Sequence, residues 1–85
     1  MSNKIYVGNL NYGTKEEELT ELFGEYGTVL SARIITDRAT GRSKGFGFVE
    51  METEDAAAAA IEQLNGKEFQ SRELKVSEAR ERSPR

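Results

Sequence analysis

The chain contains neither cysteine nor histidine. Their absence excludes disulfides, zinc sites made of thiolates or imidazoles, and catalytic nucleophiles that need a cysteine or histidine partner. The sequence therefore predicts no metal site and no cofactor, and it suits a reducing compartment. With only 85 residues, we expect one domain that is too small to enclose a catalytic cavity. We predict that the protein is not an enzyme and that its site is an exposed surface.

Long apolar runs are absent as well. The N-terminus leads directly into a strand-like segment, without the apolar stretch of a signal peptide or of a membrane-spanning helix. We therefore expect a soluble, monomeric, intracellular protein without a membrane partner. A bacterial source would place it in the cytoplasm, and a eukaryotic source would also allow the nucleus.

A net positive charge is also missing, because the formal net charge at pH 7 is −3. A basic domain is the usual expectation for nucleic-acid binding. The acidic residues, however, cluster in two predicted helices and their flanks, whereas the basic residues lie mostly in predicted strands, in one loop and near the C-terminus. If the helices cover one face of a sheet, the other face is positive. Local potential, more than net charge, steers a polyanion.

Hydrophobic periodicity and turn residues predict six elements in the order strand, helix, strand, strand, helix, strand. The predicted strands cover residues 5–10, 28–36, 44–51 and 72–77. Two right-handed β-α-β crossovers place both helices on one face, and a polar loop joins strands two and three as a hairpin. The predicted fold is α+β, a ferredoxin-like β-α-β-β-α-β sandwich. Its four-stranded antiparallel sheet has the strand order 4-1-3-2.

Capping residues mark the two helices. Thr14 with Glu17 forms a predicted capping box, so the first helix begins at about residue 15. Thr53 or Glu54 caps the second helix, which Asn65 and Gly66 end in a left-handed turn. Its inward stripe is predicted to contain Ala57, Ala60, Ile61 and Leu64.

The most informative segment is the octapeptide 44–51. Alternate side chains of a strand leave opposite faces, so Lys44, Phe46, Phe48 and Glu50 share one face, and Val49 and Met51 share the other. Because strands one and three are neighbours, Tyr6 joins the two phenylalanines on the face that no helix covers. Burying a phenylalanine is worth roughly 1.5–3 kcal/mol. Leaving two of them on the charged face therefore indicates that a ligand stacks there.

The segments 5–10 and 44–51 resemble the two signature motifs of the RNA recognition motif (RRM) family. The resemblance covers residues 3–79 and implies that Tyr6 and Phe48 stack on bases, that Phe46 contacts riboses and that Lys44 meets a phosphate. Met51 departs from the aromatic residue usual at the last position, but it points under the sheet. We expect an RRM over 1–79 and a charged, flexible tail over 80–85. As a chain with one RRM beginning at a methionine, it also resembles the stand-alone RRM proteins of bacteria, including the cyanobacterial type.

A second set of residues extends this surface. Two positions lie on strands and flank the aromatic residues, two lie in the loop after strand two, and three belong to or follow strand four. They are Arg33, Ile35, Arg38, Arg42, Lys75, Ser77 and Ala79. The resemblance implies that main-chain groups from 77 to 79 read base edges. Asn9 is interpreted as a turn former.

The leading hypothesis is a non-catalytic protein that binds single-stranded RNA of about two to four nucleotides, in a post-transcriptional role. Two alternatives remain open. The sheet or the helical face could bind a protein, and single-stranded DNA could occupy the same stacking surface, because stacking does not use the 2′-hydroxyl. An acyl-phosphate hydrolase with this strand order is disfavoured, because the first strand-to-helix loop carries no arginine.

Overall fold

The computed structural model describes residues 3–79, which form two helices and six strands. In chain order the elements are β1 (Lys4–Gly8), α1 (Glu16–Gly24), β2 (Val29–Thr36), β3 (Ser43–Met51), α2 (Glu54–Leu64), β4 (Glu68–Phe69), β5 (Arg72–Glu73) and β6 (Lys75–Glu78). Among these residues, neither helix has the length and apolar character needed to cross a bilayer. The predicted tail, 80–85, lies outside the described residues.

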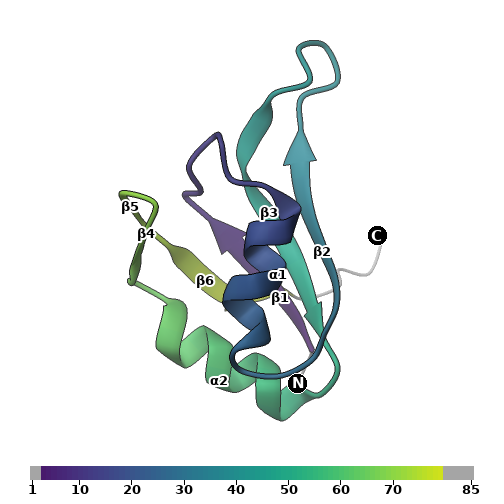
Figure 1. The fold of residues 1–85 in the computed structure, drawn as a ribbon, viewed down its shortest axis with the longest axis vertical. Coiled ribbons are helices and arrows are strands. Elements are labelled where there is room, and N and C mark those ends of the chain that lie inside the picture. The colour runs from purple at the N-terminus through teal and green to yellow at the C-terminus, as the bar shows by residue number, and fades with distance from the viewer. Residues whose placement is uncertain (1–2, 80–85) are drawn as a thin grey trace, which may run out of the picture.

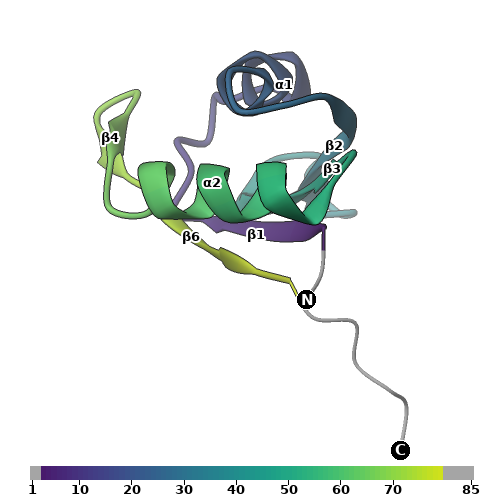
Figure 2. The same ribbon diagram turned by 90° about the horizontal axis from the view of Figure 1, so that it is seen from below.

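The main sheet is antiparallel and has the strand order β2-β3-β1-β6. Because β6 takes the place of the fourth predicted strand, this order confirms the predicted 4-1-3-2 topology and the α+β fold. Both helices lie on the same side of the sheet (Figure 2). The loop between β2 and β3 projects beyond the ends of the other strands (Figure 1). The opposite side of the sheet, which no helix covers, is called the open face below.

The core lies between the helices and the covered side of the sheet. Every strand that packs there contributes alternate apolar residues, as the period of two requires. Fully or almost fully buried are Ile5, Val7, Leu10, Leu19, Phe23, Val49, Met51, Ala57, Ala60, Leu64, Leu74 and Val76. Met51 therefore fills the core as predicted. The alanine stripe of α2 is confirmed as well, and Ile61 packs at its edge.

The start of α1 differs from the predicted capping box. The helix begins after Lys15, whose backbone N–H donates to Oε1 of Glu18 at 2.7 Å. Thr14 does not cap this helix, because it is buried and its hydroxyl donates to the side-chain oxygen of Gln70. For α2 the prediction was right, since Oγ1 of Thr53 accepts the N–H of Ala56 at 3.1 Å.

The fourth predicted strand, 72–77, is not continuous. Leu74 interrupts it, and the residues before Leu74 pair with 68–69 to form the small hairpin β4–β5. Gln70 and Ser71 make its turn with positive φ angles of 52° and 71°. Such a turn normally takes glycine or asparagine, so the residue types at 70 and 71 do not predict it. Contacts from the loop after β1 hold the hairpin in place, including the amide of Asn11, which donates to the carbonyl of Gln70.

The first strand ends at Gly8, two residues earlier than predicted. Asn9 adopts a left-handed conformation with φ of 59°, which confirms its interpretation as a turn former. Its side-chain oxygen accepts a hydrogen bond from Arg72 at 3.1 Å, and its amide donates to the carbonyl of Glu73. Asn9 therefore ties the end of β1 to the β4–β5 hairpin.

Candidate nucleic-acid interface

Three aromatic side chains from β1 and β3 meet at the centre of the open face. Tyr6 lies directly opposite Phe48 across the two strands. The ring centroids of Tyr6 and Phe46 are 5.9 Å apart, those of Tyr6 and Phe48 are 5.8 Å apart, and those of the two phenylalanines are 6.2 Å apart. Each ring therefore contacts both others at distances typical of favourable aromatic pairs. This aromatic triad is the arrangement that the strand alternation predicted.

The triad is less exposed than the sequence suggested. Phe48 is the most exposed of the three rings, with 38% of its surface accessible. Tyr6 and Phe46 are half-buried. Because the rings shield one another, the protein keeps part of the stabilisation that fully exposed phenylalanines would lose. Their mutual contacts also hold the rings in place before any ligand arrives, which lowers the entropy cost of binding.

Gly8 provides the space in which the Tyr6 ring lies. A Cβ atom at this position would stand 2.6 Å from Oη and 2.9 Å from Cε2 of Tyr6. Both atoms belong to the far end of a side chain that can rotate about its own bonds, so the ring would turn while the backbone stayed in place. The orientation of Tyr6 on the open face therefore depends on the missing side chain of Gly8.

Gly8→Ala is expected to weaken RNA binding about two- to tenfold, because a base on the displaced ring loses about half of the roughly 1–3 kcal/mol that stacking supplies. The melting temperature should change little. Fluorescence anisotropy with a short labelled RNA and a thermal melt monitored by circular dichroism measure the two effects. Gly13→Ala is the matched control, since the nearest atom to a Cβ there is 3.4 Å away. Equal affinities for the two variants would contradict the role given to Gly8.

Charge is distributed unevenly between the two sides of the molecule. By strand alternation and register, the charged residues of the open face within 3–79 are Lys4, Arg33, Lys44, Glu50 and Lys75. On the other side, α1 has Glu16, Glu17 and Glu18 in its first turn, and α2 begins with Glu54 and Asp55. The open face is thus positive although the chain is acidic. This separation agrees with the charge pattern expected from the sequence, and it favours a polyanion on the open face.

Of the second set of predicted residues, four lie beside the triad or line the hollow next to it, and the two loop arginines do not. Ser77 and Lys75 lie on β6 opposite Tyr6 and Gly8, so they flank the triad. Arg33 and Ala79 line a hollow with Phe48, described below. Ile35 is half-buried on β2. Arg38 and Arg42 lie in the loop that projects beyond the sheet (Figure 1), where the N–H of Asp37 donates to the carbonyl of Arg42. These two arginines line none of the described hollows near the triad.

The backbone N–H of Ala79, one of the groups expected to read bases, already donates a hydrogen bond within the sheet. The backbone N–H of Ala79 donates to the carbonyl of Lys4 at 2.9 Å, which continues the pairing of β6 with β1. This N–H is therefore not available to a base edge while the pairing persists. The expectation that main-chain groups from 77 to 79 read bases is not supported for this donor.

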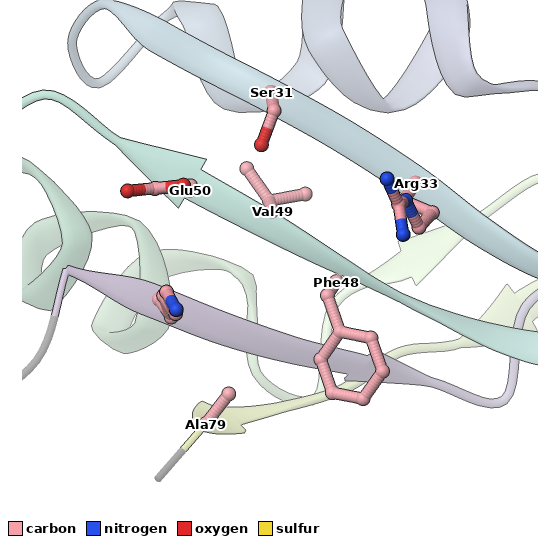
Figure 3. A pocket seen from close by; sticks show the side chains of 7 residues that line it. Ser31, Arg33, Phe48, Val49, Glu50 and Ala79 are labelled. Carbon is pink, nitrogen blue, oxygen red and sulfur yellow. The ribbon is translucent and has the colours of Figure 1, made fainter. Parts of the chain in front are cut away.

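A hollow of about 360 Å³ opens on the open face beside Phe48. Figure 3 shows Phe48 and Glu50 along β3, with Ser31 and Arg33 on the neighbouring strand and Ala79 on the far side. Its lining residues are Lys4, Ser31, Arg33, Phe48, Val49, Glu50 and Ala79. Sequence reasoning had not included Lys4, Ser31 or Glu50 in the site. Strand alternation alone would have found them, because they occupy open-face positions of three strands.

Tyr12 is a further exposed aromatic residue that the sequence did not single out. It is 68% exposed, and the guanidinium of Arg72 lies 5.9 Å from the centre of its ring. A Cβ atom at Gly45 would come within 3.0 Å of this ring. Since Gly45 is buried and its neighbours Lys44 and Phe46 face the other way, Tyr12 does not belong to the triad.

Residues 5–75 match the family model described as RNA recognition motif. The chain belongs to the RRM family. RbpE from Nostoc sp. is 54% identical over 78 residues, which cover 92% of this chain and 79% of RbpE. The crystal structure of RNA binding protein PG1 is 63% identical, with a TM-score of 0.91, and covers 98% of this chain and all of that one. The resemblance to the cyanobacterial type of single-RRM protein is thereby confirmed.

A structure with RNA is also similar to this RRM. The protein in the Sex-lethal protein–RNA complex matches this chain with a TM-score of 0.91 and 34% sequence identity. The match covers 98% of this chain and 50% of the Sex-lethal chain.

Within residues 3–79 of the present chain, no group of three histidine, cysteine, aspartate or glutamate side chains is placed to hold a metal ion.

Proposed function

We propose that this RRM binds single-stranded RNA across its open face, with one base stacked on Tyr6 and the next on Phe48. Phe46, whose ring contacts both of the others, contacts the riboses, and Lys44, next to Phe46 on the same face of β3, meets a phosphate. The observation that carries the proposal is the aromatic triad, in which three rings lie within 6.2 Å of one another on the uncovered side of the sheet. The Sex-lethal complex, a similar domain bound to RNA, supports it.

The physical basis is stacking combined with a moderate positive potential. Each base stacked on an aromatic side chain contributes about 1–3 kcal/mol and does so with little dependence on sequence. The basic residues of the open face attract the backbone, while the acidic helices repel it from the covered side. We propose that the protein acts as an intracellular monomer, without catalysis, on two to four nucleotides of an RNA in a post-transcriptional process.

The salt dependence of binding tests this picture. With two or three phosphate contacts, the logarithm of the binding constant should fall with the logarithm of salt concentration with a slope of about −1.4 to −2.1. Titrations with a short single-stranded RNA between low and physiological salt give this slope. A much steeper slope would show that the charged segment 80–85 or the arginines of the loop dominate, which contradicts binding centred on the triad. A DNA of the same sequence, measured alongside, tests the DNA alternative.

A protein ligand remains the second candidate because of one feature of the covered side. A hollow of about 260 Å³ between α1 and the β4–β5 hairpin is lined by three acidic side chains, two apolar ones and one amide: Glu18, Glu21, Glu25, Leu22, Phe69 and Gln70. Its charge suits a basic segment of another protein. RNA binding on the open face leaves this hollow uncovered, so the two functions do not exclude each other.

A further inference from the structure

Glu50 is the one acidic residue among the open-face strand positions within 3–79, and its charge opposes phosphate binding. A carboxylate on a surface that attracts a polyanion raises the local energy of the backbone. The other charged residues of this face are Lys4, Arg33, Lys44 and Lys75. Attraction of the RNA backbone therefore does not explain the Glu50 carboxylate, and another role has to be found for it.

The position of Glu50 relative to Phe48 indicates such a role. The two residues are two apart on the same face of β3, so their Cα atoms lie about 7 Å from each other. This distance is comparable to the width of a base. Both line the hollow beside the triad, together with Arg33 from β2 (Figure 3). In Figure 3 the Glu50 carboxylate points away from the Phe48 ring, and rotation about the side-chain bonds of Glu50 brings it to one edge of a base stacked on Phe48.

The fold does not use this carboxylate. Within residues 3–79, the side chain of Glu50 makes no hydrogen bond or ion pair, although it is half-buried. An ionised carboxylate only accepts hydrogen bonds, through two adjacent oxygens. It therefore selects a partner that presents two adjacent donors.

We propose that the hollow beside Phe48 selects guanine, with the Glu50 carboxylate accepting N1–H and N2–H from its Watson–Crick edge. This inference rests on the proposed function, because it requires a base stacked on Phe48. Guanine alone among the four bases offers two neighbouring donors on that edge; adenine and cytosine offer one amino group beside an acceptor, and uracil offers one N–H between two acceptors. The guanidinium of Arg33, in the same hollow, donates to O6 of the guanine.

A purely structural role for Glu50 makes a different prediction. Lys4 lies directly opposite Glu50 in the pairing of β1 with β3, and opposite charges in such cross-strand pairs stabilise a sheet. Removing the charge of Glu50 would then change stability and would affect all RNA sequences equally. Base discrimination therefore separates the two roles.

The test uses five labelled RNA pentamers, UUGUU, UUAUU, UUCUU, UUUUU and a UUGUU in which inosine replaces guanine. The unmodified chain should bind UUGUU about tenfold more tightly than the other three standard pentamers. Inosine lacks the 2-amino group, so its pentamer should bind several-fold more weakly than UUGUU. Glu50→Gln keeps the shape but leaves one acceptor oxygen. Its guanine preference should fall to less than about twofold, while its affinity for UUUUU stays the same or rises.

Glu52→Gln is the matched control, because Glu52 is exposed and follows the end of β3. It removes the same charge and should leave the guanine preference unchanged. The inference is overturned if the unmodified chain binds the four standard pentamers equally, if Glu50→Gln keeps the preference, or if Glu50→Gln weakens all pentamers alike. If no pentamer binds, or if binding is independent of Phe48, the proposed function itself fails.

Discussion

Phe48→Ala is expected to weaken binding of a short single-stranded RNA about 5- to 150-fold. The ring is the exposed member of the triad, at 38% accessibility, and offers its surface to a base. Stacking of one base is worth about 1–3 kcal/mol, and 1.4 kcal/mol corresponds to a factor of ten in affinity. Isothermal titration calorimetry or fluorescence anisotropy measures the loss directly.

The variant is not neutral for the fold, because Phe48 contacts both Tyr6 and Phe46. Losing these two contacts costs about 1–3 kcal/mol of folding stability. Circular dichroism at the binding temperature must therefore show that the variant is folded. Tyr12→Ala is the matched control, since it removes an even more exposed ring outside the triad. If Phe48→Ala binds as tightly as Tyr12→Ala, the triad is not the stacking surface.

Gly47→Ala is expected to be the most destabilising single-methyl addition on β3. A Cβ atom at this buried position would lie 2.2 Å from the carbonyl oxygen of Arg33 and 3.0 Å from Cα of Ile34. Both are backbone atoms of the neighbouring strand β2, so neither can rotate away. Overpacking of this kind costs about 1–3 kcal/mol, occasionally more. We expect the melting temperature to fall by about 4–24 °C.

Gly24→Ala adds the same methyl group but is not expected to lower the melting temperature. Gly24 is the last residue of α1, and apart from its chain neighbours and the backbone of its own helix no atom lies within 4 Å of a Cβ placed there. Alanine favours the helix over glycine by roughly 0.5–1 kcal/mol, so this variant should melt at the same or a higher temperature. If Gly47→Ala and Gly24→Ala have the same melting temperature, β2 and β3 do not approach each other as closely at Gly47 as the structure shows.

The sequence predicted the aromatic triad because its members follow from strand alternation and from the handedness of β-α-β crossovers. Phe46 and Phe48 are two residues apart on one strand, and the crossover rule makes β1 the neighbour of that strand. Their partial burial could not be predicted, because it depends on contacts between rings of different strands. The hollow beside Phe48 was missed for a similar reason: three strands and the residue after β6 form its lining, and β2 is irregular between Val29 and Ser31.

The errors in the secondary structure arose where tertiary contacts override local preference. Thr14 has the residue type of a helix cap, yet its hydroxyl serves the β4–β5 hairpin through Gln70. Gln70 and Ser71 lack the usual turn chemistry, and their hairpin is held by hydrogen bonds to residues about sixty positions away in the chain, such as Asn11. Such contacts leave no pattern in the local sequence.

Mapping of backbone amide chemical shifts during titration with a mixed-sequence oligoribonucleotide tests the central claim most directly. We predict that the largest changes fall on β1 and β3, around Tyr6, Phe46 and Phe48, while the amides of α1 and α2 change little. Changes concentrated on α1 around Leu22 and in the hollow beside it, or no changes at all, would contradict RNA binding on the open face.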